Sequence, residues 1–181
     1  MKQYIATYLP ALTVLLILTA AASAQTFQSS GSTTISVTVA AEASLYIEDS
    51  TTTLTGGPLF SDYTGTTRFI YKIRTSQGSG TGTITSLVTA DFSPSGGPSV
   101  SNPPTAGDAL SYTCSVSSPA TACSGTQTAS TTAAQPVASF GANARSSRNG
   151  NSGQVNWTLT NDPLYATGAY SATVTFTVSA T

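Results

Sequence analysis

The sequence predicts an all-β protein, an immunoglobulin-like β-sandwich of about seven to nine antiparallel strands. Apolar and polar residues alternate with a period of two in several runs, which is the pattern of half-buried strands. Clusters of Gly, Pro, Asn and Ser separate these runs at intervals of roughly 8–20 residues. No run after residue 24 shows helical periodicity. A jelly roll or a barrel is the alternative arrangement.

The clearest alternation is near the C-terminus, where two runs are separated by a loop. Residues 155–160 place Val155, Trp157 and Leu159 on one face, and residues 170–180 alternate in the same way. The loop contains Asp162-Pro163 and Gly168, so we expect two adjacent antiparallel strands. Trp157 is the only tryptophan, and we place it at the centre of the core. The predicted core residues are Trp157, Leu159, Tyr170, Val174 and Phe176.

The other predicted strands follow from the same period. They cover residues 34–48, 51–54, 68–74, 83–92, 110–116 and 137–142. Residues 93–108 are rich in Pro, Gly and Ser, and their number favours a crossover between sheets over a hairpin.

The run 34–48 is longer than a usual strand of about 5–6 residues. It is one strand, or two strands bent at the small residues 40–43. No cysteine fastens it, and a polar stretch precedes it, so it can pair with its own sheet or with a neighbouring molecule. This candidate donor strand comprises Ile35, Val37, Val39, Ala41 and Leu45.

The first 24 residues have the pattern of a secretory signal peptide. Lys2 precedes a short apolar run, and Ala22-Ser23-Ala24 provides a small-residue cleavage site. The apolar run is shorter than the roughly 20 residues of a membrane-spanning helix. We therefore expect a secreted or cell-surface protein with one domain over residues 25–181; an uncleaved anchor is the alternative.

Composition excludes several classes of partner and chemistry. Only 7% of the residues are charged, and no basic cluster is present for nucleic acid or anionic lipid. The chain has no histidine, no phosphate-binding loop and no nucleophile elbow, so we expect neither an enzyme nor a cofactor. Glu48, Asp49 and Asp62 could hold calcium together, but solvated carboxylates at strand ends are the favoured interpretation. No metal site is predicted.

The two cysteines, Cys114 and Cys123, predict a disulfide in a secreted chain. The bond would close a hairpin around Pro119. A closed loop of about ten residues corresponds to roughly 2.5–3 kcal/mol in the chain-entropy account.

The C-terminal run 167–178 resembles the closing strand of bacterial spore coat U-type secreted proteins and pilus subunits, and residues 35–39 resemble their opening strand. This resemblance implies a secreted β-sandwich that assembles into fibres or coats by donated strands. Trp157-Thr158-Leu159 followed by Asn161-Asp162-Pro163 resembles the distal motif of the WxL surface domain, which implies binding to the cell wall.

These expectations favour a structural surface or fibre subunit whose partner is itself or a cell-surface component. The alternative is a glycan- or cell-wall-binding module, for which Tyr46, Tyr63 and Tyr165 are the candidate aromatic residues. A secreted hydrolase ranks third.

Overall fold

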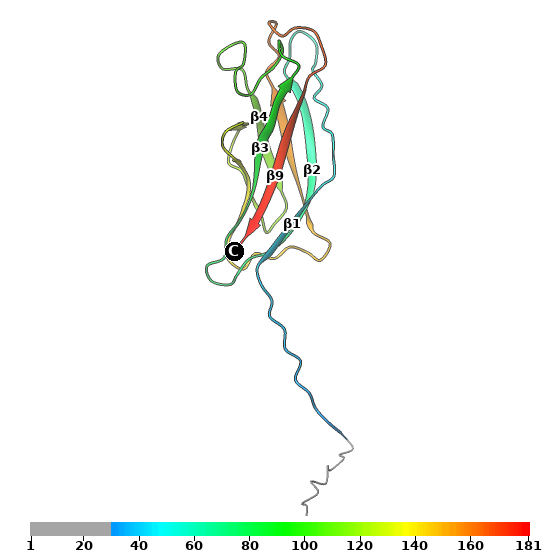
Figure 1. Ribbon diagram of the computed structural model, residues 1–181, viewed down its shortest axis with the longest axis vertical. Helices are drawn as coiled ribbons and strands as arrows, with labels where there is room; N and C mark the ends of the chain where they lie inside the picture. The colour runs from blue at the N-terminus through cyan, green and yellow to red at the C-terminus, as the bar shows by residue number, and fades with distance from the viewer. Residues whose placement is uncertain (1–29) are drawn as a thin grey trace, which may run out of the picture. The chain divides into compact units, whose positions relative to one another are not determined.

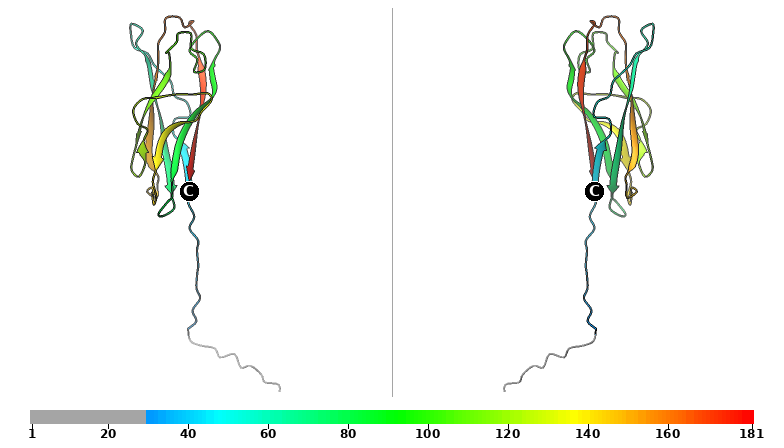
Figure 2. Two further views of the ribbon diagram at one scale, coloured as in Figure 1. Left: turned by 90° about the vertical axis from the view of Figure 1, so that its left-hand side faces the viewer. Right: turned by 90° about the vertical axis from the view of Figure 1, so that its right-hand side faces the viewer.

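The computed structural model describes residues 30–181 and confirms the predicted fold class, a β-sandwich of nine strands in two antiparallel sheets. Figure 1 shows the strands, and Figure 2 shows the two layers from the sides. Residues 30–37 and residues 38–181 belong to separate units, and every strand is in the second unit. The predicted signal peptide and its cleavage site before Gln25 lie outside the described residues.

Most neighbouring strands within a sheet are not consecutive in the chain. The first sheet has the order β1 (Glu42–Ile47), β2 (Tyr63–Arg74), β8 (Asn151–Leu159), β4 (Leu110–Val116) and β6 (Gln127–Thr128). The second has the order β5 (Thr121–Ala122), β7 (Gln135–Phe140), β3 (Gly82–Ser93) and β9 (Ser171–Ala180). The loop after β3 crosses from the second sheet to the first, as its length predicts.

Alternating side chains of the central strands fill the space between the sheets. Trp157 and Leu159 of β8 are buried, as predicted, and Phe69 and Tyr71 of β2 are fully buried beside them. Polar groups in this core have partners. The hydroxyl of Tyr112 accepts a hydrogen bond from Ser86 at 3.1 Å and donates one to the Pro136 carbonyl at 2.9 Å, joining β4 to the opposite sheet.

The predicted pairing of the two C-terminal runs is wrong. β8 pairs with β2 and β4, whereas β9 pairs with β3 in the other sheet. Tyr170 precedes β9 and is only half-buried, so it is not a core residue. Its hydroxyl donates to the Ala166 carbonyl at 2.7 Å within the connecting loop. Val174 and Phe176 do face the core, but both remain partly exposed.

The N-terminal run does not form a strand over its whole predicted length. Only Glu42–Ile47 is a strand, and residues 30–41 belong to no strand. Leu45 lies within β1 opposite Tyr71 of β2 and packs against the core, so it is not available for donation. The predicted strand 51–54 is also absent; only an isolated bridge joins Thr55 to Thr64.

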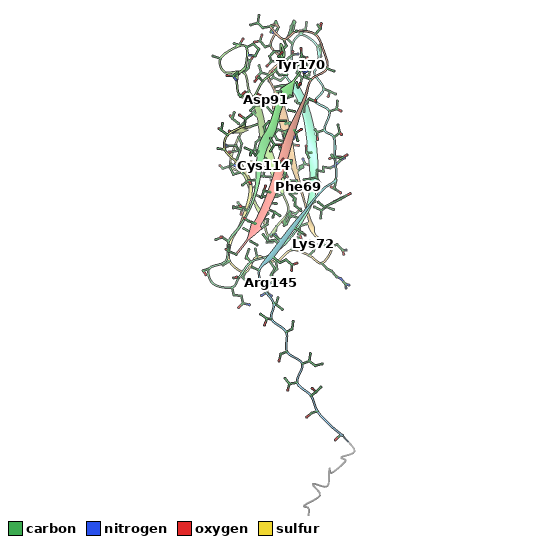
Figure 3. The ribbon with its side chains drawn as sticks, in the orientation of Figure 1. Phe69, Lys72, Asp91, Cys114, Arg145 and Tyr170 are labelled. Carbon is green, nitrogen blue, oxygen red and sulfur yellow. A yellow bond between two sulfur atoms is a disulfide. The ribbon has the colours of Figure 1, made fainter. Side chains whose placement is uncertain are left out.

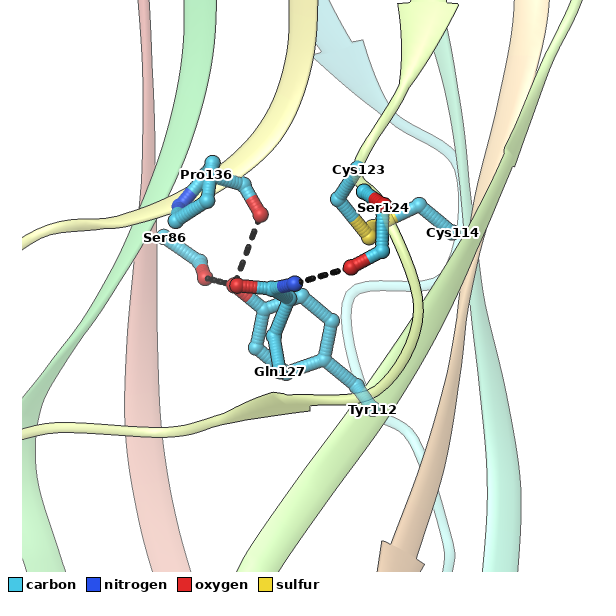
Figure 4. Close-up of a disulfide and its surroundings, with 7 residues drawn as sticks. All are labelled: Ser86, Tyr112, Cys114, Cys123, Ser124, Gln127 and Pro136. Atoms are coloured by element: carbon cyan, nitrogen blue, oxygen red, sulfur yellow. Dashed lines mark hydrogen bonds between the residues drawn. A yellow bond between two sulfur atoms is a disulfide. The ribbon is translucent and has the colours of Figure 1, made fainter.

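The predicted disulfide is present, with an S–S distance of 2.07 Å, but it does not close a hairpin. Cys114 lies in β4 of the first sheet, and Cys123 directly follows β5 of the second (Figure 4). The backbone amide of Cys123 donates to the Val137 carbonyl of β7 at 3.0 Å. The bond therefore joins the two sheets on the side where their edge strands, β5 and β6, have only two residues each.

Asp91, at the end of β3, organises the long crossover loop. Its carboxylate accepts hydrogen bonds from the amides of Phe92, Val100 and Ser101 and from the hydroxyls of Ser99 and Ser101, at 2.7–3.0 Å. Burial alone would raise the pKa of this carboxyl, but the hydrogen bonds outweigh burial and hold its pKa well below its usual range.

We expect Asp91→Ala to lower the free energy of unfolding by about 1–3 kcal/mol at neutral pH, because several donors lose a charged acceptor. The depressed pKa means that the carboxylate stabilises the fold above its unfolded-state pKa of about 3.9, and that this contribution is lost as the pH falls through the folded-state value. Urea unfolding between pH 7 and pH 2 should show a smaller acid-induced loss for Asp91→Asn than for the parent chain. The control is Asp62→Asn, whose exposed carboxylate makes one long contact, 3.3 Å from the Asn161 amide. Equal effects of the two variants would contradict this role.

Candidate assembly surface

The segment before β1 carries apolar side chains that face solvent. Ile35, Val37 and Val39 are 91%, 83% and 62% exposed. They alternate with Ser36 and Thr38, the pattern of a half-buried strand, although no strand of the described residues pairs with them. Burying a Val or Ile side chain contributes roughly 1.5–3 kcal/mol, so this segment exposes surface that a partner could bury. Residues 34–41 are called the free segment below.

β9 forms one long edge of the second sheet. Its ten residues, from Ser171 to Ala180, pair with β3 on one side, and no strand of the described residues pairs with the other side. The strand contains no charged residue and no proline. Lysines, prolines and short length are the usual protections of an edge against addition of another strand. β9 lacks all three.

The inward side chains of β9 are not fully covered. Ala172, Val174, Phe176, Val178 and Ala180 alternate with exposed Ser and Thr, yet each is only partly buried. Phe176 contacts the core rings of Phe69 and Trp157, with centroids 6.3 and 6.5 Å apart. An added strand could therefore extend both the hydrogen bonds of β9 and the apolar layer beneath it.

β1, the matching edge of the first sheet, is less suited to accept a strand. It has six residues; Glu42 at its start and Glu48 directly after its end lie on the exposed face, on the two sides of Ser44 and Tyr46. Arg74 fixes its first residues: Nε donates to the Ala40 carbonyl at 2.7 Å, and the guanidinium pairs with Glu42 at 3.0 Å. The uncharged edge of β9 is therefore the better acceptor.

The three tyrosines considered for glycan binding do not form one aromatic surface. Tyr46 is 65% exposed on β1, opposite Ile70 of β2. Tyr63 and Tyr165 are half-buried where β2 begins and where β8 leads to β9. The Tyr165 hydroxyl donates to Asp108 at 3.3 Å; burial, followed by the nearby Asp108 charge, raises the pKa of Tyr165 to about 12.

Asp108 and Asp162 face one another between the loops that contain them. Burial and the neighbouring Asp162 raise the pKa of Asp108, while the Leu164 amide and the Thr105 hydroxyl lower the pKa of Asp162. Asp162 accepts hydrogen bonds from both of these groups.

Glu48, Asp49 and Asp62 do not converge: Asp49 pairs with Arg68 at 3.0 Å, and Asp62 contacts Asn161. Within residues 30–181, no three acidic or cysteine side chains gather as metal ligands.

Asn156, in the N-glycosylation tripeptide Asn156-Trp157-Thr158, lies in the middle of β8. Its amide oxygen accepts hydrogen bonds from Thr66 and Gln154, both at 3.1 Å.

Comparison with protein-family models, curated proteins and solved structures finds no match. The part of the chain that the structure describes contains no helix long and apolar enough to cross a membrane.

Proposed function

We propose that the protein is a structural subunit of a cell-surface or secreted fibre or coat, and that it assembles with copies of itself by strand addition. The free segment of one copy pairs with the open edge of β9 in another. Ile35 and Val37 then extend the partly exposed apolar layer of β9, and Val39 lies where the segment leaves β1. The observation that carries the proposal is that Ile35, Val37 and Val39 are exposed, whereas β1, the strand that follows them, is paired with β2.

The geometry favours addition to another copy over a loop back to the same one. Residues 38–41 lead directly into β1, whose first residue lies opposite Arg74. Arg74 holds Ala40 and Glu42 at that point, so the stretch that connects the free segment to β1 is short and is fixed at its β1 end. A segment from another copy has no such constraint on its direction along β9.

The experiment compares the chain beginning at Gln25 with a chain beginning at Glu42. The shorter chain keeps all nine strands, so we expect it to remain folded, with an unchanged near-UV circular dichroism spectrum. We expect the longer chain to form large particles in light scattering and fibres in negative-stain microscopy, and the shorter chain to stay monomeric. A matched control replaces Ser36 and Thr38 with Asn, which keeps the apolar residues. Equal assembly of the truncated chain would overturn the proposal.

A glycan- or cell-wall-binding module is the second candidate. Tyr46 supports it, because its side chain is 65% exposed on β1. Sedimentation with purified cell wall would test this function: binding that Tyr46→Ala removes, with assembly unchanged, would favour the module. Equal binding of the variant, or no binding by the parent chain, would remove its support.

A further inference from the structure

The charged side chains of residues 30–181 are sorted along the sandwich. Five are basic and seven are acidic. Two ion pairs, Arg68–Asp49 and Arg74–Glu42, each at 3.0 Å, account for two of each sign. The basic residues outside these pairs are Lys72, Arg145 and Arg148; the corresponding acidic residues are Glu48, Asp62, Asp91, Asp108 and Asp162.

Strand register places these groups, apart from Glu48, at opposite ends of the sandwich; the backbone of Glu48 bonds to Arg68, midway along β2. Asp62 directly precedes β2, Asp108 lies two residues before β4, and Asp162 follows β8; Tyr63 and Leu110 both pair with Leu159 there. Tyr71 pairs with Asn151 at the other end, near Lys72 and the loop that carries Arg145 and Arg148. Figure 3 shows Asp91 towards one end and Lys72 and Arg145 towards the other. These are called the acidic end and the basic end.

The separation is large on the scale of electrostatic screening. β2 has 12 residues and runs from the acidic end to the basic end, a length of about 40 Å. The Debye length at physiological ionic strength is about 8 Å. Each end therefore presents its own charge to a neighbouring molecule, and the two ends of one copy do not neutralise each other.

The acidic end also exposes apolar side chains on two joined loops. Leu59, Phe60 and Leu164 are 96%, 64% and 68% exposed, and the Asn161 amide group links their loops by donating to the Ser61 carbonyl at 3.1 Å. Leu59 and Phe60 have φ angles of 59° and 56°, a left-handed conformation that non-glycine residues rarely adopt. The two residues form the centre of a tight turn, closed by the Ser61 amide, which donates to the Pro58 carbonyl at 3.3 Å.

The basic end has a shallow cleft. Val39, Arg74, Gln77 and Arg145 are among the residues that line it, and Val39 is 62% exposed. The backbones of Arg74 and Arg145 form an isolated β-bridge, which fixes the cleft's wall. It combines the apolar side chain of Val39 with the guanidinium of Arg145, which is outside the two ion pairs. This is the complement of an apolar loop that is followed by the carboxylate of Asp62.

We propose that copies of this chain associate head to tail, with the Leu59–Phe60 loop of one copy docked in the basic-end cleft of the next. This contact deepens the proposed self-assembly and rests on it. Two identical ends repel one another, so opposite ends meet. A contact between two different surfaces repeats from copy to copy. It produces a filament when the rotation from one copy to the next does not close a ring. Val39 to Ala41, which lead into β1, line the same cleft, so the docked loop packs on Val39 where the free segment leaves the sandwich, and the strand added to β9 runs through Ile35 and Val37.

A charge exchange tests the contact in the chain beginning at Gln25. We expect R145E/R148E, which makes the basic end acidic, and D62K/D108K, which cancels the net charge of the acidic end and puts lysines beside the docking loop, each to lose association at least tenfold in sedimentation velocity. An equimolar mixture should assemble again as alternating copies, which also shows that both variants fold. Association of the parent chain should weaken as NaCl rises from 50 to 500 mM. The control T113E/S115E places new charges on the exposed face of β4 and should assemble like the parent chain.

The outcomes separate this contact from strand addition. Normal assembly of both charge variants, or no recovery in the mixture, would overturn the head-to-tail contact. If the charge variants assemble while the chain beginning at Glu42 does not, strand addition stands without the end contact. If the parent chain does not associate at all, both proposals are overturned.

Discussion

Trp157→Ala is expected to lower the free energy of unfolding by about 3–5 kcal/mol, the range for removing a large buried aromatic side chain. Trp157 is 4% exposed, and its ring lies 5.0 Å from that of Tyr112 and 6.5 Å from that of Phe176, measured between centroids. Its Nε1 donates to the Thr67 hydroxyl at 2.9 Å, and Thr67 also shares a hydrogen bond of 2.6 Å with Thr52. The substitution therefore removes a ring that joins the two sheets and one member of a buried polar chain.

Denaturant unfolding, followed by far-UV circular dichroism, measures the effect. Trp157→Phe is the matched control, because it keeps most of the apolar volume and removes the indole N–H; we expect it to cost less than half as much. Domains are typically stable by only about 5–15 kcal/mol, so the alanine variant should unfold at a much lower denaturant concentration. A loss below about 1 kcal/mol for Trp157→Ala would contradict the central position of this ring.

Thr177→Lys on β9 is expected to abolish assembly while leaving the fold intact. Thr177 is exposed opposite Thr85 of β3, and surface substitutions of this kind usually change stability by less than about 0.5 kcal/mol. The added ammonium group lies along the edge where we expect the free segment to pair, and a lysine is a natural block to strand addition. Light scattering should fall to the monomer value.

The control for this prediction is Thr83→Lys. Thr83 is also exposed on a strand, but β3 is paired on both sides there, with Ser139 of β7 and Ser179 of β9. The two variants have the same net charge. Assembly should therefore be lost for Thr177→Lys alone. If both variants assemble like the parent chain, the open edge of β9 is not the acceptor.

The fold class could be predicted from the sequence because strand alternation is a local property. Trp157 and Leu159 share a face in any strand that contains them, so their burial follows from spacing. Which sheet a strand joins is not local. The loop with Asp162-Pro163 suggested a hairpin, whereas its residues bond to Thr105 and to the β1–β2 loop and carry the chain across to the other sheet.

Of the two parts of the candidate assembly surface, the sequence predicted the free segment but not the edge of β9. The alternation of Ile35, Val37 and Val39 was clear, but the same pattern predicted a strand through Leu45, and only the structure shows where pairing begins. The open edge of β9 could not be predicted, because it depends on strand order. The separation of charge into two ends depends on register as well: Asp62 and Lys72 are ten positions apart on one strand and its preceding loop.

Amide hydrogen exchange on assembled protein tests the strand-addition account most directly. The chain beginning at Gln25 would be compared in its assembled form and in the monomeric form obtained with Thr177→Lys. We predict that residues 34–41 and β9 both gain protection on assembly, because new backbone hydrogen bonds join them. The interior strands β8 and β2 should be equally protected in both forms. Assembled protein in which residues 34–41 still exchange as fast as in the monomer would contradict the account.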